Sequence, residues 1–253
     1  PDVSSAASDV YKRQALTCYR KFQFMNTPVN IICMKWGDKY DASYVNKLYN
    51  MVSRNLSKEF RFICLTDDNS DFLPAIQSFD IPKLNLPEGI PERGWTKLVT
   101  FSKHISDIKG QCLFLDLDVI IVNGIDELFD LPGDFFIIKD FVRRDITGNS
   151  SVYRFEMGKF PDVLENFQKN FEKIRSKFRN EQEYLSDYMQ KNHSLSYWPL
   201  DWCQSFKKHC IQKGLKQFFL APSLPPEAKV IIFHGKPNPC LLYTSDAADD
   251  TSG

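Results

Sequence analysis

The sequence lacks the features that mark several large classes of protein. It has no apolar run close to the roughly 20 residues that a membrane-spanning helix needs, and no signal peptide precedes Ala15. It has no internal repeat, no Cys-x-x-Cys pair and no excess of either charge, with 32 Lys and Arg against 32 Asp and Glu. We therefore expect a cytoplasmic protein rather than a membrane-spanning, repeat or zinc-ribbon protein. Peripheral contact with the inner membrane stays open.

The two ends of the chain do not resemble natural coding sequence. Residues 4–14 can be encoded by one strand of a common transposon-type sequencing adapter, and residues 240–250 by the complementary strand. We interpret residues 1–14 and 240–253 as adapter-derived or disordered tails of a metagenomic fragment; the alternative is native low-complexity termini. Residues 15–239 are long enough for one α/β domain, which we expect to be C-terminally truncated.

Charge and cysteine content narrow the class of partner for this domain. Setting the two ends aside removes two basic and five acidic residues and leaves 30 basic against 27 acidic. Nucleic-acid binding needs a concentrated basic face, so no nucleic-acid partner is expected. The remaining cysteines lie largely in apolar runs and indicate buried thiols without a disulfide partner. They are Cys18, Cys33, Cys64, Cys112, Cys203 and Cys210.

Strand-like runs rich in β-branched and aromatic residues alternate with helix-like periodic segments. This alternation predicts a single α/β domain with a Rossmann-like, mostly parallel sheet flanked by helices. The predicted strands are residues 29–34, 60–65, 111–122, 135–139, 151–155 and 228–233. The predicted helices are residues 42–56, 96–108, 161–177 and 181–190, and residues 74–91 form a proline-rich connection with a short strand at most.

Asp116 and Asp118 interrupt the most apolar of the predicted strands, residues 111–122. In an extended chain, side chains two positions apart point to the same side, so the two carboxylates share one face and Leu117 takes the other. Buried carboxylates without a counter-charge cost several kcal/mol each, so this face needs a cation or solvent. Oxygen ligands favour Mn²⁺ or Mg²⁺. The alternative is a pair of strand-end acids that cap a helix or pair with lysines.

Several motifs in a fixed order resemble bacterial glycosyltransferases of the GT-A fold, in the family that includes glycogenin and the lipopolysaccharide galactosyltransferases (glycosyltransferase family 8). The resemblance covers nearly all of residues 15–239. Its motifs are a polar loop after the first strand, Leu113-Phe114-Leu115-Asp116-Leu117-Asp118, Asn149-Ser150-Ser151-Val152, Asn180-Glu181-Gln182-Glu183 and Phe233-His234-Gly235-Lys236-Pro237.

This resemblance implies a divalent metal site, with Asp116, Asp118 and His234 as ligands to Mn²⁺ or Mg²⁺ against the diphosphate of a nucleotide sugar. The residues alone agree on His234, because it ends a predicted strand and precedes Gly235 and Lys236, whose amine can neutralise a phosphate. The other histidines, His104, His193 and His209, are interpreted as surface or core residues.

The remaining motifs supply candidates for catalysis and donor binding. Gln182 is the better candidate for the position beneath the anomeric carbon, and Glu181 stands where the family usually has Asp, which leaves the donor sugar open. An acidic cluster that caps the helix start is the alternative. By their position at the end of the first strand, Lys35, Trp36 and Asp38 are candidates for contacts with the nucleotide base. Further candidates for donor contacts are Met34, Lys97, Leu117, Asn149, Ser150, Ser151 and Gly235.

Each of these assignments has a structural alternative. Lys97 fits an exposed helix lysine nearly as well as a diphosphate or sugar contact, and Gly148-Asn149 fits an ordinary turn. Trp198 and Trp202, near Lys207 and Lys208, suit either a sugar or membrane surface or, more simply, core anchors beside solvated lysines.

Taken together, the residues and the resemblance predict a metal-dependent, retaining hexosyltransferase. It moves a sugar from a nucleotide diphosphate sugar, UDP-sugar first among the candidates, to a hydroxyl of a cell-surface glycan or glycolipid, as in lipopolysaccharide biosynthesis. The alternatives are a nucleotidyltransferase and an inactive carbohydrate-binding domain. A nucleotidyltransferase would carry a glycine-rich, basic loop after the first strand, which residues 35–38 match poorly.

Overall fold

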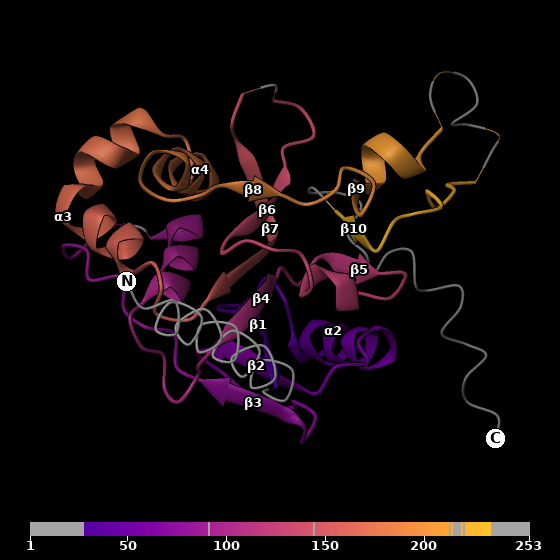
Figure 1. The fold of residues 1–253 in the computed structure, drawn as a ribbon. Helices are drawn as coiled ribbons and strands as arrows, with labels where there is room; N and C mark the ends of the chain where they lie inside the picture. The colour runs from indigo at the N-terminus through magenta and orange to yellow at the C-terminus, as the bar shows by residue number, and fades with distance from the viewer. Residues whose placement is uncertain are drawn as a thin grey trace, which may run out of the picture.

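The computed structural model describes residues 28–233 except 91, 144, 213, 215–218 and 220. Its centre is a seven-stranded sheet in the order β3-β2-β1-β4-β7-β6-β8, in which β7 alone runs against the other strands (Figure 1). This confirms the predicted single α/β domain with a mostly parallel sheet. The strands are β1 (Val29–Lys35), β2 (Phe60–Thr66), β3 (Ile76–Phe79), β4 (Gln111–Leu115), β6 (Phe136–Lys139), β7 (Gly148–Glu156) and β8 (Ser196–Tyr197).

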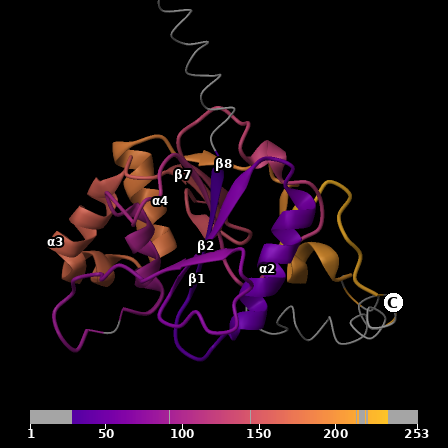
Figure 2. The ribbon, with the colours of Figure 1, turned by 90° about the horizontal axis from the view of Figure 1, so that it is seen from below.

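Helices cover both faces of this sheet, so its central strands are apolar on both sides. On one face, Ile31 and Cys33 of β1 pack against α2 (Ala42–Asn55). On the other, Ile32 and Met34 join a second core formed with η1 (Arg93–Phe101), α3 (Pro161–Lys177) and α4 (Glu181–Asn192). Figures 1 and 2 show α2 on the opposite side of the sheet from α3 and α4. Successive side chains of β1 thus point to opposite faces of the sheet and pack into two different cores.

The helix boundaries follow local capping chemistry. The side chain of Asp41 accepts a hydrogen bond from the backbone N–H of Ser43 and starts α2. Asn180 does the same for the N–H of Glu183 and starts α4. Such caps satisfy backbone donors that have no partner within the helix. The predicted helices 42–56, 161–177 and 181–190 are therefore confirmed within one or two residues.

The predicted single strand over residues 111–122 is wrong. The chain leaves the large sheet after β4, turns at Asp116-Leu117-Asp118 and resumes as β5 (Val119–Ile121) in a second sheet. This three-stranded sheet has the order β5-β10-β9, with β10 (Val230–Ile232) antiparallel to β5 and parallel to β9 (Cys203–Ser205). Hydrophobicity could not separate the two strands, because both are buried and apolar.

Two further predictions are corrected. The predicted helix 96–108 is a 3₁₀ helix that ends at Phe101, because both the N–H and the hydroxyl of Ser102 bond back to the carbonyl of Val99. Residues 149–151 are not a turn but the start of β7, which the sequence placed at residue 151. Pairing with β4 and β6 overrides the turn preference of Gly148-Asn149.

Within the described residues, five cysteines are free and buried, and no helix is long and apolar enough to cross a membrane. The expected tails, residues 1–14 and 240–253, lie outside the described residues, as does Cys18.

Candidate functional site

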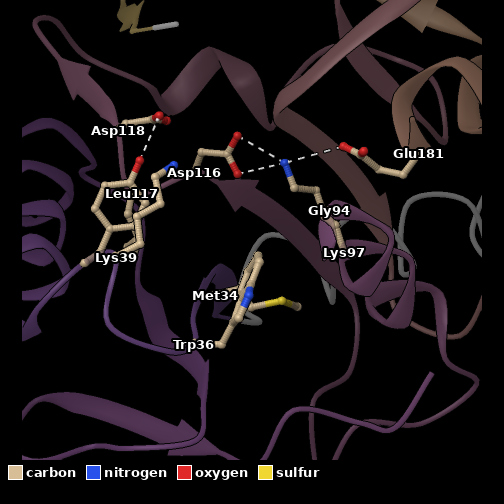
Figure 3. Close-up of a pocket in the computed structure, with 10 residues that line it drawn as sticks. Met34, Trp36, Lys39, Gly94, Lys97, Asp116, Leu117, Asp118 and Glu181 are labelled. Atoms are coloured by element: carbon tan, nitrogen blue, oxygen red, sulfur yellow. Dashed lines mark hydrogen bonds and ion pairs between the residues drawn. The ribbon is translucent and has the colours of Figure 1, made fainter. Parts of the chain in front are cut away.

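A cavity of about 310 Å³ lies where β1 and β4 end. Open α/β sheets bind ligands at the carboxyl ends of their strands, so its position is typical of a binding site. Side chains from the end of β1, the loop between β1 and α2, η1, the β4–β5 turn and α4 converge there (Figure 3). The cavity is lined by Met34, Trp36, Lys39, Tyr40, Gly94, Lys97, Asp116, Leu117, Asp118 and Glu181.

Lys97 and Asp116 form the central ion pair of the cavity. The Lys97 Nζ atom is 2.8 Å from Oδ1 and 3.1 Å from Oδ2 of Asp116, and both side chains are largely buried. Burial by itself lowers the pKa of Lys97, but attraction to Asp116 and Glu181 outweighs it and raises the pKa above the ordinary value. The amine is therefore held charged at the wall of the cavity.

Asp118 has a different environment from Asp116, although only Leu117 separates them. Burial, followed by repulsion from Asp116, raises the pKa of Asp118 to about 6. The Tyr40 hydroxyl donates to its Oδ2 at 3.1 Å and partly offsets this effect. Within the described part of the chain, Oδ1 has no hydrogen-bond partner. Asp118 thus presents a free, poorly stabilised carboxylate oxygen.

Ser150 of β7 connects the ion pair to α4. Its hydroxyl donates to Oε1 of Glu181 at 2.8 Å and accepts from Lys97 Nζ at 3.2 Å. Lys97 Nζ also lies 4.0 Å from the same Glu181 oxygen. Asp116 and Glu181 therefore flank one ammonium group, that of Lys97, and Ser150 holds Glu181 beside it.

The other residues of the β7 and α4 motifs lie behind the cavity wall. Gln182 accepts from the Ser150 N–H at 3.3 Å and is not among the lining residues, whereas Glu181 is. Asn149 accepts from the Ser151 N–H at 3.0 Å, and the Ser151 carbonyl accepts from the Asp116 N–H at 2.9 Å. These three residues support the lining residues from behind.

The candidate residues at the end of β1 point in different directions, because successive side chains of an extended chain lie on opposite sides. Met34 and Trp36 line the cavity, and Trp36 is 41% exposed. Lys35 points away from the cavity: its buried amine donates to the carbonyl of Asp68 at 3.3 Å. Asp38 is exposed and is not a lining residue.

Sequence reasoning missed three lining residues, Lys39, Tyr40 and Gly94. Tyr40 could have been predicted, because it directly precedes the cap residue Asp41 and so has a fixed place at the start of α2. Gly94 could also have been predicted, since it is a glycine directly before the helix that supplies Lys97. Lys39 could not, because an exposed lysine in a polar loop is ordinary.

His234, Gly235 and Lys236 lie outside the described residues. The described residues contain no cluster of three or more His, Cys, Asp or Glu side chains close enough to hold a metal. Asp116 and Asp118 are the part of the predicted ligand set that the structure brings to the cavity. His193, interpreted as a surface or core residue, contacts Asp162 at 2.7 Å.

Trp198 is a core anchor, as the simpler interpretation of its surroundings expected. It is 2% exposed, stacks on Phe136 with ring centroids 4.8 Å apart, and donates from Nε1 to the Val152 carbonyl. Trp202 is partly buried against the same core, with Lys229 5.0 Å from its ring. Neither tryptophan lines the cavity.

No protein-family model matches the sequence, and no curated protein resembles it significantly. Solved structures do. The galactosyltransferase LgtC, crystallised with donor and acceptor sugar analogs, superposes with a TM-score of 0.59 at 16% identity, over 83% of this chain and 88% of LgtC. An active-site mutant of LgtC superposes with a TM-score of 0.58 at 13% identity, over 83% of this chain and 89% of the mutant. At this identity the likeness shows a shared fold: the chain has the GT-A-like α/β fold of these galactosyltransferases.

Proposed function

We propose that this protein is a metal-dependent glycosyltransferase that moves a hexose from a UDP-sugar to a hydroxyl acceptor. The observation that carries the proposal is the group of three carboxylates and one buried ammonium around a cavity at the carboxyl ends of β1 and β4. Anionic diphosphates need cations at such a site, and sugar hydroxyls need acceptors. The similar structure of LgtC with donor and acceptor sugar analogs supports the same chemistry.

The residues of the cavity fit a divalent cation. Asp118 is a partly buried carboxylate whose pKa is raised by burial and by repulsion from Asp116, and no described residue donates a hydrogen bond to its Oδ1. Asp116 lies beside it with Lys97 as its present counter-ion. Mn²⁺ and Mg²⁺ take oxygen ligands and keep positions for water and substrate phosphates, so two carboxylates suffice on the protein side. We propose Asp116 and Asp118 as ligands, with His234 as a third from the C-terminal motif.

The proposed reaction breaks the bond between the anomeric carbon and the phosphate oxygen, and its electron pair leaves with UDP. A new bond forms between the anomeric carbon and the acceptor oxygen, whose proton passes to the departing phosphate oxygen or to water. A bound divalent cation would supply charge stabilisation for the leaving UDP. Lys97 adds a fixed positive charge, and Glu181 accepts a hydrogen bond from a donor hydroxyl. Met34 and Trp36 offer the base an apolar surface. This arrangement holds the donor with its diphosphate toward Asp116 and Asp118.

The acceptor side of the proposal is less specific. We propose a cell-surface glycan or glycolipid as the acceptor, in a bacterial lipopolysaccharide-type assembly with retention of configuration. The protein would then work in the cytoplasm, with peripheral contact at the inner membrane. We propose that Gln182 supports catalysis indirectly, because it contacts the Ser150 backbone beside Glu181.

Replacement of one carboxylate tests the proposed function. Purified protein is screened with UDP-glucose and UDP-galactose for Mn²⁺-dependent release of UDP. Asp118→Ala should lower the turnover at least about 100-fold while the circular dichroism spectrum is unchanged, because a buried ligand to the cation is lost. Asp130→Ala removes an exposed Asp that pairs with Lys58 and serves as the matched control. Full activity of Asp118→Ala would contradict the proposal.

Calorimetry separates the proposal from its alternatives. UDP should bind only with Mn²⁺ present, because the carboxylates repel the diphosphate without it. An inactive carbohydrate-binding domain predicts no Mn²⁺-dependent UDP binding. A nucleotidyltransferase predicts release of pyrophosphate from a nucleoside triphosphate and a sugar phosphate, which an enzymatic pyrophosphate assay detects.

A further inference from the structure

Gly94 lies against the carboxylate of Glu181. A Cβ atom built at position 94 would stand 3.2 Å from Oε2 of Glu181, closer than such contacts normally come. The backbone conformation of Gly94 is not the left-handed one that favours glycine, so its conformational freedom does not explain the residue. What the glycine provides at this wall of the cavity is space.

Contacts of the neighbouring residues hold the backbone of Gly94 and the start of α4 in place. Trp95, next to Gly94, is 6% exposed and stacks on Phe167 of α3 with ring centroids 4.9 Å apart. Glu181 is the first residue of α4, and its Oε1 is held by the Ser150 hydroxyl at 2.8 Å. Both η1 and α4 are thus fixed where they meet. A side chain at position 94 would be accommodated by displacing Oε2.

Oε2 is the Glu181 oxygen that is left for a ligand. The hydrogen bond from Ser150 and the approach of Lys97 both involve Oε1, and no described residue donates to Oε2. Glu181 nevertheless lines the cavity, with a side chain 12% exposed. A carboxylate oxygen only accepts hydrogen bonds, so its partner in the cavity has to be a donor such as a sugar hydroxyl.

We propose that Gly94 is a specificity-determining residue: by lacking a side chain, it keeps open the space in which Oε2 of Glu181 receives a hydroxyl of an uncharged donor hexose. This inference rests on the proposed function and adds to it that the hexose is uncharged. A hexuronic acid is disfavoured, because its carboxylate would meet Glu181 next to Asp116, with Lys97 already shared between them.

The test compares the binding of UDP with that of UDP-hexose, at saturating Mn²⁺, by isothermal titration calorimetry. The probes are UDP, UDP-glucose, UDP-galactose and UDP-glucuronic acid. Gly94→Ala should weaken the tighter of the two UDP-hexoses about tenfold and change UDP less than twofold, since one hydrogen bond to a charged group is lost. In the unmodified protein, UDP-glucuronic acid should bind more weakly than that hexose.

A second substitution separates a specific effect from a general one. Glu181→Asp shortens the acid and withdraws its oxygens from position 94, so Gly94→Ala added to Glu181→Asp should change hexose binding less than twofold. Gly124→Ala, where a Cβ meets no atom within 4 Å, is the control and should bind like the unmodified protein.

Three outcomes for the Gly94→Ala substitution overturn the inference: unchanged UDP-hexose affinity, an equal loss for UDP and UDP-hexose, or a tenfold loss that persists on the Glu181→Asp background. Preferred binding of UDP-glucuronic acid also overturns it. Absence of UDP and UDP-hexose binding in the unmodified protein contradicts the proposed function instead, and thermal melting identifies any variant that has not folded.

Discussion

At the scale of single residues, the two carboxylates of the β4–β5 turn, Asp116 and Asp118, have different environments. Asp116 is paired with Lys97 through both oxygens, whereas among the described residues the Tyr40 hydroxyl is the one hydrogen-bond donor to the carboxylate of Asp118. The difference follows from geometry, because the turn after β4 directs one acid toward η1 and the other toward Tyr40, ahead of α2. Lys97 neutralises the charge of Asp116, whereas Asp118 has no paired cation among the described residues.

The raised pKa of Asp118 predicts that, without a bound metal, the protein is less stable at neutral pH than at acidic pH. The pKa of Asp118 is raised to about 6 from an ordinary 3.8, so the folded state binds the proton more tightly than the unfolded state. The free energy of unfolding should therefore fall as pH rises from about 4 to 6 and stay lower above that range. Asp118→Asn removes the charge and should stabilise the protein by about 2 to 3 kcal/mol at pH 8, with little effect at pH 4.

Urea unfolding at both pH values in EDTA measures this difference. Asp130→Asn, at a side chain that is 58% exposed, is the control. If Asp118→Asn is destabilising at pH 8, or stabilising to the same degree at both pH values, ionisation of Asp118 is not the source of the cost.

At the scale of elements, the start of α4 fixes the place of Glu181. Asn180 caps the helix through the Glu183 N–H at 3.1 Å, and Glu181 and Gln182 follow in the first turn. From there Glu181 reaches Ser150 of β7 and the cavity. The cap thus acts on the site through the helix that it begins.

Asn180→Ala should lower the free energy of unfolding by about 1 kcal/mol, because the cap hydrogen bond is lost. Denaturant titration at pH 7 measures the loss. Asn192→Ala, at the exposed end of the same helix, should stay within about 0.5 kcal/mol. Equal effects at the two ends would show that the cap has no special role.

At the scale of the whole molecule, two apolar cores on opposite faces of one sheet hold the cavity between them. Both cores contain cysteines: Cys33 and Cys64 face α2, and Cys112 faces η1 and α3. Burial raises the pKa of Cys33 well above its usual range and that of Cys112 to about 12. Such thiols are shielded from both solvent and reagents.

The native protein should therefore expose no more than two of its seven cysteines to the thiol reagent DTNB. In guanidinium chloride under reducing-agent-free conditions, all seven should react. Mass spectrometry after alkylation of the native protein should find the described cysteines unlabelled, namely Cys33, Cys64, Cys112, Cys203 and Cys210. Rapid labelling of any of these five would contradict the packing of the core that contains it.

The sequence by itself determined the fold class and most elements, because apolar periodicity and capping residues act over a few neighbouring positions. Residues 161–177 form the predicted helix, and the order of buried strands and helices indicated a mostly parallel sheet. Asp116 and Asp118 also stood out, because charged residues within an apolar run are unusual, whereas Lys97 and Glu181 were suggested only by the family resemblance.

Only the tertiary structure decided how these residues meet. Whether residues 111–122 form one strand or two depends on β10, more than 100 residues later, which pairs with β5. Glu181 rather than Gln182 lines the cavity where the start of α4 contacts Ser150 of β7, and the importance of Gly94 depends on a contact with a residue 87 positions away. Such contacts are set by packing between distant segments, and the local patterns of a sequence do not encode them.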